Sequence, residues 1–118
     1  MRNLAPDIMR QRLLIEGYYT IDVGEQQISR YMSGIAKKLE LRTYGDATIH
    51  STGGAGRPEN EGYDAFIPLI DSGISLYVWS SSKFFASILF TCKEFSNDNA
   101  VRYAQDFFGS TEIEYSTF

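Results

Sequence analysis

Three strand-like runs follow one another in the middle of the sequence with only a few residues between them. The runs cover residues 65–70, 74–79 and 84–91, and they are separated by Asp71-Ser72-Gly73 and by the serines at 80–82. Breaks this short suit hairpins, so neighbouring runs are expected to pair as antiparallel strands. The centre of the fold is therefore predicted to be an antiparallel sheet.

A helix is predicted upstream of these strands, over residues 23–40. The tetrapeptide Asp22-Val23-Gly24-Glu25 is a capping-box pattern, in which an acceptor side chain at the N-cap is followed three residues later by a glutamate. An apolar stripe at helical spacing comes next, and lysines stand in the last turn, where positive charge suits the helix dipole. The stripe is Ile28, Tyr31, Met32, Ile35 and Leu39, and the lysines are Lys37 and Lys38.

The rest of the chain adds a second helix and three strands. The helix is predicted to start near Ser96 and to stop at Gly109. Strands are predicted over 12–21 and 47–51, and the alternation of Ile113 and Tyr115 indicates a closing edge strand. Four glycines and Pro58 make residues 52–62 a loop, either simply flexible or a lid over a site.

These elements predict an α+β fold with the order β-α-β-β-β-β-α-β. The economical packing is a two-layer α/β sandwich, an antiparallel sheet with two helices on one face. The other face must then be solvated or paired with a second copy of the chain. Residues 1–11 are expected to be a loose lead-in, because Pro6 argues against regular structure there, and residues 12–118 a single domain.

Charge and cysteine content exclude several classes of protein. The formal net charge is −4 and the 11 Lys and Arg are dispersed, so the electrostatic signature of a nucleic-acid-binding protein is missing. Cys92 is the only cysteine, so no intrachain disulfide can form. No apolar stretch is long enough for a membrane span, and a reducing, cytoplasmic setting is expected.

The most specific motif is the spacing of Ser72, Trp79 and Cys92. Asp71-Ser72-Gly73, then a strand ending in Trp79, then a strand ending in Phe90-Thr91-Cys92, resembles the short prokaryotic, pyruvoyl-dependent form of S-adenosylmethionine decarboxylase. Leu13-Leu14-Ile15-Glu16 with Tyr18, and Gly45-Asp46-Ala47-Thr48-Ile49, are similar to that family's first two strands. The resemblance covers about residues 12–108 and is strongest over 72–92.

The resemblance implies a self-processing enzyme. In the family, the serine attacks the carbonyl of the residue before it, the resulting ester breaks by elimination, and the serine becomes a pyruvoyl group at a new N-terminus. That group is an electron sink for decarboxylation, and a cysteine returns the proton. By resemblance, Ser72 is the pyruvoyl precursor, the cut falls between Asp71 and Ser72, and Cys92 is the acid.

The chain departs from the family at the helper positions. Tyr77 stands where the family has its processing histidine, and a phenol, with an ordinary pKa near 10, is a poor proton shuttle at neutral pH. Asp64 stands where the family has a processing serine, and Ser81 where a glutamate holds the substrate ribose. Gly73 replaces a histidine. The resemblance therefore implies that nucleophile and acid are kept while their helpers differ.

Three further expectations concern substrate binding. Glu61 lies in an acidic stretch that would attract a cationic ligand such as the sulfonium of S-adenosylmethionine, and Phe84 offers an aromatic face for a sulfonium or adenine. Tyr77 could supply a polar or stacking contact. Each residue also has a plain structural interpretation: a turn at Ser72, a small buried side chain at Cys92, solvated acids around Glu61, and core or strand positions for the aromatics.

The sequence leaves three functional hypotheses. The first is pyruvoyl-dependent decarboxylation of S-adenosylmethionine for polyamine synthesis, in a homodimer or larger homo-oligomer. The second is an uncleaved lyase that releases methylthioadenosine when the substrate's own carboxylate attacks its γ-carbon. The third is a non-catalytic subunit that pairs with an active decarboxylase. No metal is expected, since nothing near His50, the only histidine, has metal-ligand spacing.

Overall fold

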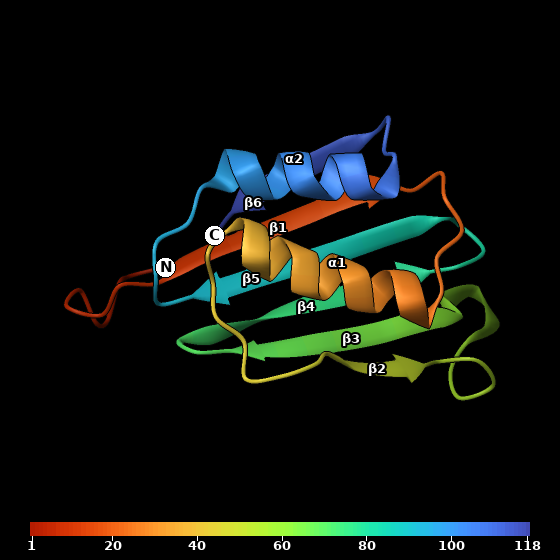
Figure 1. The fold of residues 1–118 in the computed structure, drawn as a ribbon, viewed down its shortest axis with the longest axis horizontal. Coiled ribbons are helices and arrows are strands. Elements are labelled where there is room, and N and C mark those ends of the chain that lie inside the picture. Colours follow the sequence, from red (N-terminus) through yellow and green to blue (C-terminus); the bar gives the residue numbers. More distant parts are fainter.

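The helices and strands occur in the predicted order, and the computed structural model describes all 118 residues. One six-stranded antiparallel sheet has the strand order β2-β3-β4-β5-β1-β6 (Figure 1). No helix combines the length and the apolar composition needed to cross a membrane. The elements are β1 (Gln11–Tyr18), α1 (Glu25–Lys38), β2 (Thr48–Ser51), the short 3-10 helix η1 (Pro58–Asn60), β3 (Gly62–Leu69), β4 (Ser72–Trp79), β5 (Phe84–Thr91), α2 (Asn97–Phe108) and β6 (Ile113–Thr117).

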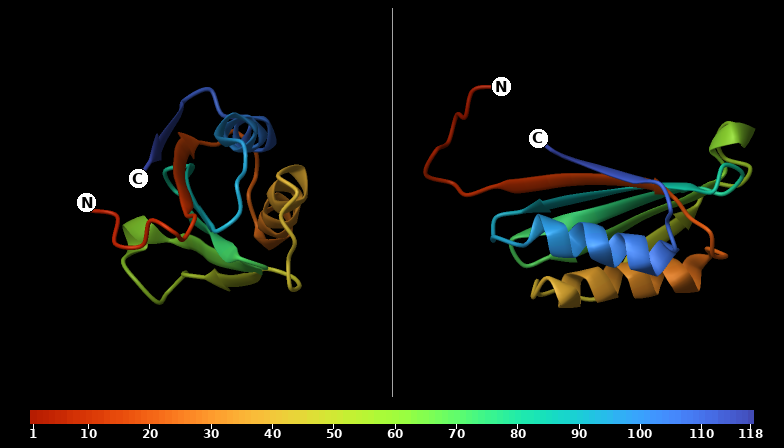
Figure 2. Two further views of the ribbon diagram at one scale, coloured as in Figure 1. Left: turned by 90° about the vertical axis from the view of Figure 1, so that its left-hand side faces the viewer. Right: turned by 90° about the horizontal axis from the view of Figure 1, so that it is seen from above.

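Both helices cover the same face of the sheet, which confirms the predicted α+β architecture (Figure 2). Alternate residues of the central strands point toward the helices and are buried there, as the two-residue period of a strand requires. The core between the layers is almost entirely aliphatic and aromatic. Its largest fully buried side chains are Tyr31, Phe85, Phe108, Leu13, Ile15, Ile28, Met32, Ile35, Ile67, Ile74, Leu76 and Leu89.

One polar chain crosses this core. The Tyr31 hydroxyl donates to Ser87 Oγ at 3.0 Å, and Ser87 Oγ donates to the carbonyl of Ser75 at 3.3 Å. Burial raises the pKa of Tyr31 well above its ordinary value, although the hydrogen bond to Ser87 opposes that shift. These two hydrogen bonds thus join α1 to β5 and β5 to β4, and the buried polar groups involved all have partners.

The turn between β3 and β4 is tighter than the sequence predicted. Asp71-Ser72-Gly73 was expected to be the break, yet only Ile70 and Asp71 lie between the paired residues Leu69 and Ser72. Ser72 and Gly73 are therefore strand residues. Glycine suits position 73 because it has no Cβ, and a Cβ there would lie only 2.5 Å from the ring of Phe66. At its other end β3 begins at Gly62, three residues before the predicted start.

The helix ends agree with the sequence at α2 and differ at α1. Ser96 Oγ accepts from Asn99 N–H at 3.1 Å, and Gly109 ends α2 with φ of 61°, as predicted. In α1, Asp22 was expected to be the N-cap, but the N-cap is Gly24. The helix starts there because Gln27 Oε1 accepts from Gly24 N–H at 2.9 Å, which is the reciprocal half of a capping box.

The sheet face opposite the helices, called the open face below, has no helix on it (Figure 2). Cross-strand pairing arranges its side chains in rows. The central row runs from β2 to β6 through His50, Asp64, Tyr77, Ala86, Glu16 and Glu114. Partly or largely exposed apolar and aromatic side chains fill much of the remaining area: Leu14, Tyr18, Phe66, Trp79, Phe84, Ile88 and Phe90.

Candidate active site

The junction between Asp71 and Ser72 combines backbone strain with a held carbonyl group. Asp71 has φ of 81°, a left-handed conformation that non-glycine residues rarely adopt and that costs on the order of 1–3 kcal/mol. Its carbonyl oxygen accepts a hydrogen bond from the backbone N–H of Cys92 at 2.9 Å. The peptide at which the sequence predicts a cut is therefore strained, and one donor already holds its carbonyl oxygen.

The hydroxyl group of Ser72 is enclosed and has no hydrogen-bond partner. Strand alternation puts Ser72 on the helix-covered face, in the same set of positions as Ile74 and Leu76. A buried hydroxyl without a partner costs about 1–3 kcal/mol, which is unusual enough to call for a functional explanation. No other protein group holds this oxygen.

Cys92 meets this junction through its backbone rather than its thiol. Its side chain is exposed, directly after the buried Thr91 that pairs with Ser72. Continued alternation along β5 gives Cys92 a position on the open face, opposite to that of Ser72. In the uncleaved chain the two backbones lie side by side, and the two side chains leave the sheet in opposite directions.

Asp64 and Tyr77 face each other across β3 and β4 in the central row of the open face. Together with His50 of β2 they line a shallow depression of about 430 Å³, which also includes Thr48, Phe66 and Ser75. Tyr77 lies five residues along β4 from Ser72, about 17 Å at the rise of a strand. Within one chain, Asp64 and Tyr77 are thus assembled with each other and not with Ser72.

The predicted substrate-binding residues gather at the far end of the sheet. Glu61 precedes β3, and its carbonyl accepts from Ser80 N–H at 2.9 Å, which puts Glu61 beside the turn that contains Ser81. Phe84 follows that turn, and its ring lies 5.3 Å from both Trp79 and Tyr18, centroid to centroid. Glu61, Ser81 and Phe84 are therefore neighbours.

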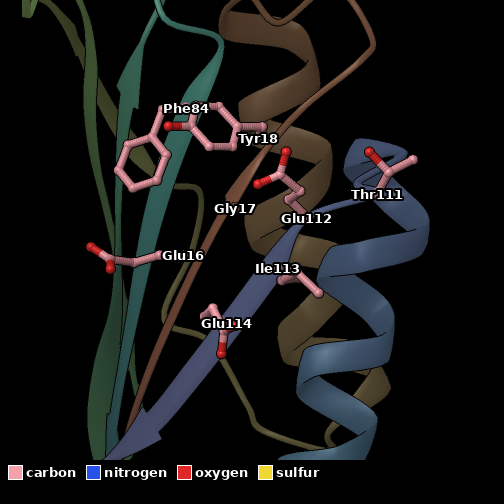
Figure 3. A pocket seen from close by; sticks show the side chains of 8 residues that line it. All are labelled: Glu16, Gly17, Tyr18, Phe84, Thr111, Glu112, Ile113 and Glu114. Atoms are coloured by element: carbon pink, nitrogen blue, oxygen red, sulfur yellow. The ribbon is translucent and has the colours of Figure 1, made fainter.

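A cleft beside Phe84 was not foreseen from the sequence. It has a volume of about 400 Å³ and is lined by the adjacent Tyr18 and Phe84 rings and by three carboxylates (Figure 3). The carboxylates are Glu16, Glu112 and Glu114, and none forms an ion pair, since the chain's one salt bridge joins Arg57 and Glu59 at 3.8 Å. Glu16 and Glu114 are direct cross-strand partners. A strongly negative edge therefore borders the aromatic end of the open face.

His50, Tyr18 and Trp79 are the residues that sequence reasoning did not assign to the site. The alternation of side chains along each strand could have placed these residues on the open face. Their grouping depends on cross-strand register, which joins segments far apart in the sequence, such as Tyr18 with Phe84 and His50 with Asp64. Register of this kind is set by turn geometry and burial in the folded chain.

Comparisons with known proteins agree with this geometry. The family model described as S-adenosylmethionine decarboxylase matches residues 14–118. The fold is similar to the crystal structure of the adenosylmethionine decarboxylase from Aquifex aeolicus, with a TM-score of 0.74 and 17% sequence identity over 94% of this chain and 89% of that one. No curated protein sequence matches the chain closely enough to count as a relative. Because the family match spans nearly the whole fold, this chain belongs to the S-adenosylmethionine decarboxylase family.

Proposed function

We propose that the protein is a lyase acting on S-adenosylmethionine, and that it cuts itself between Asp71 and Ser72 to form a pyruvoyl group. The observation that carries this proposal is the state of that junction. A positive φ at Asp71, a carbonyl held by Cys92 N–H and an unpartnered Ser72 hydroxyl occur together at one peptide bond. Family membership adds the reaction class, carbon–carbon bond lyase.

The residues at the junction suit the first step of such a cut. Ser72 Oγ attacks the carbonyl carbon of Asp71, and negative charge develops on the carbonyl oxygen. The C–N bond between the two residues then breaks, the backbone nitrogen of Ser72 takes up the hydroxyl proton and leaves as an amine, and an ester remains. The N–H of Cys92, which donates to that oxygen in the uncut chain, stabilises this charge without rearrangement. Strain at Asp71 is relieved when the bond breaks, which lowers the barrier further.

The residues present fit a pyruvoyl group at position 72, where the hydroxyl precursor and its activated carbonyl meet. Once formed, the group would supply an electron sink for loss of carbon dioxide from an amino-acid substrate. Cys92 is the proposed proton donor, and this role requires that residue 72, once cut from Asp71, turns from the helix-covered face to the open face, where Cys92 lies. Glu61, Ser81 and Phe84 provide carboxylate, hydroxyl and aromatic contacts for a cationic nucleoside.

A homodimer through the open face would gather these groups. Ser72 and Cys92 lie at one end of the sheet, Asp64 and Tyr77 near the middle, and Glu61 and Ser81 at the other end. No single chain can bring groups about 17–25 Å apart onto one small substrate. A second copy packed antiparallel on the open face would place its middle and far rows over the Ser72 end of the first. Partly exposed Phe66, Tyr77 and Phe90 give this face the apolar surface of an interface.

Intact mass under denaturing conditions tests the cut. We expect two fragments, residues 1–71 and residues 72–118, with the second beginning in a pyruvoyl group that reacts with hydrazines. Ser72→Ala is expected to stay at full length, whereas the matched control Ser75→Ala, three residues along the same strand, is expected to cut as the wild type does. A wild-type chain that stays whole would overturn pyruvoyl formation.

A second candidate is an uncleaved lyase that releases methylthioadenosine. The observation that favours it is the enclosure of Ser72 on the helix-covered face, away from the open-face depression. On this proposal Asp64 and Tyr77 position the substrate so that its carboxylate reaches its γ-carbon. Full-length protein incubated with S-adenosylmethionine would then produce methylthioadenosine. Binding without any product would instead indicate a non-catalytic subunit.

A further inference from the structure

His50, Asp64 and Tyr77 form one straight line of polar side chains across three strands. Asp64 is the direct cross-strand partner of His50 on β2 and of Tyr77 on β4. Direct partners have Cβ atoms about 4.5–5.5 Å apart, so each neighbour is within reach of the next. All three are exposed, and all three line the same depression on the open face.

The lining of this depression favours one kind of ligand. It contains a carboxylate, an imidazole, the hydroxyls of Thr48 and Ser75 and the rings of Phe66 and Tyr77, and no lysine or arginine. Hydrogen-bond acceptors beside aromatic faces attract a cation with N–H donors. A primary ammonium group, with three donors and one positive charge, has the matching chemistry.

The polar groups of the line are uncommitted. The side chains of His50, Asp64 and Tyr77 make no hydrogen bond with another protein group, although nearby Ser75 carries the core network through its carbonyl. Asp64 also has no salt-bridge partner. Their hydrogen-bonding capacity is therefore available to a ligand.

We propose that this depression binds the primary ammonium group of the substrate and that His50 removes a proton from it. The inference rests on the proposed function, because an amino-acid substrate carries such a group and can condense with a carbonyl only as the free amine. Since Ser72 and Tyr77 of one chain lie about 17 Å apart, that carbonyl would come from position 72 of the second copy in the proposed homodimer. Asp64 holds the ammonium and balances the imidazolium that forms. Phe66 and Tyr77 provide the aromatic surface around it.

The proton transfer is balanced in atoms and charge. One N–H bond of the ammonium breaks, its electron pair stays on the amine nitrogen, and the proton joins a ring nitrogen of His50. Histidine is the side-chain type whose ordinary pKa allows this exchange near neutral pH. Within one chain, the titratable groups that share the depression with His50 are Asp64 on the adjoining strand and Tyr77 beyond it.

The single histidine makes the test direct, because its ring protons give one set of signals in a proton NMR spectrum. S-adenosylmethionine is expected to shift these signals. Methylthioadenosine, which keeps the nucleoside and lacks the ammonium, is expected to leave them in place. If calorimetry shows that S-adenosylmethionine binds while the His50 signals stay unchanged, the inference is wrong and the proposed function stands. If no binding occurs at all, the proposed function fails.

Matched variants distinguish the effect of a carboxylate in the depression on binding from the effect of the overall negative charge of the protein. Asp64→Asn is expected to weaken binding of S-adenosylmethionine about 10-fold or more, as loss of a charge-assisted contact implies. Asp106→Asn removes the same charge from an exposed position on α2, on the opposite side of the sheet, and is expected to change affinity less than about twofold. Equal effects of both variants would overturn the assignment.

A conservative variant isolates the role of His50. His50→Gln keeps a hydrogen-bonding group that cannot accept a proton, so it is expected to bind S-adenosylmethionine within about threefold of wild type and to slow condensation of the bound amine about 100-fold. An unchanged condensation rate in His50→Gln would refute the proton-transfer role.

Discussion

At the scale of single residues, Gly73 shows how closely the open face is fitted around the junction. A Cβ at this position would lie 2.5 Å from two atoms of the Phe66 ring, so the ring occupies space that any other residue would need. The local surface beside Ser72 is therefore aromatic.

Gly73→Ala is expected to destabilise the protein by about 1–3 kcal/mol, since a methyl group must displace the Phe66 ring. Urea unfolding measures this change. Gly45→Ala, where a Cβ would meet nothing within 4 Å, is the control and is expected to stay within about 0.5 kcal/mol of wild type. Adding Phe66→Ala to Gly73→Ala is expected to recover part of the loss. No recovery would mean that the ring is not the obstacle.

Alkaline pH is expected to destabilise the fold through its buried tyrosines. Burial raises the pKa of Tyr31, Tyr19 and Tyr103 above the ordinary value of 10.0. The unfolded chain therefore loses phenolic protons that the folded chain keeps, and stability falls as pH rises beyond about 10. For the fully buried Tyr31 this loss is at most about 1.4 kcal/mol per pH unit. Tyr31→Phe is expected to flatten the stability profile above pH 10; an unchanged slope would contradict this cause.

At the scale of helices and strands, the sequence predicted which elements form better than where they begin. Period and capping residues identified α1 and α2, because those signals are local in the chain. The start of α1 was misplaced by two residues because Asp22 and Gly24 both suit a cap, and the choice depended on Gln27 reaching back to Gly24. The β3–β4 turn was misplaced because pairing of Leu69 with Ser72 decides it.

The packing of α1 on α2 depends on Gly34. A Cβ there would come within 1.8 Å of the Tyr103 hydroxyl and 2.9 Å of the ring carbon that bears it. Gly34→Ala gains about 1 kcal/mol of helix propensity. We expect thermal unfolding to show a net loss of stability, because the Tyr103 ring must move out of its contacts with Tyr31 and Phe107. Tyr103→Leu in the Gly34→Ala background is expected to reverse the sign of that substitution, and additive effects would exclude the contact.

At the scale of the whole molecule, the open face decides whether the proposed residues can act together. Sequence could place Asp64, Tyr77 and Phe84 on one face by alternation, but it could not show that Ser72 and Tyr77 lie about 17 Å apart on β4 in the folded chain. The position of a side chain along its strand and the sheet face on which it lies define a site only when the register between strands is also known. The candidate site was therefore predicted as a list of residues and not as an arrangement.

Ile88→Lys on the open face is expected to convert the proposed homodimer to a monomer, because a charge would be buried without a partner. Sedimentation velocity measures the change. Tyr44→Lys adds the same charge at an exposed residue outside the sheet and is expected to leave the assembly intact. A wild-type chain that sediments as a monomer at micromolar concentration would remove the dimer proposal.

The strand order has a consequence for a chain cut after Asp71. The first fragment would contain β1, β2 and β3, and the second would contain β4, β5 and β6. Because β1 of the first fragment lies between β5 and β6 of the second, strands of the two fragments are interleaved in one hydrogen-bonded sheet. Scission would therefore leave the outline of the molecule unchanged, and only denaturation would separate the halves.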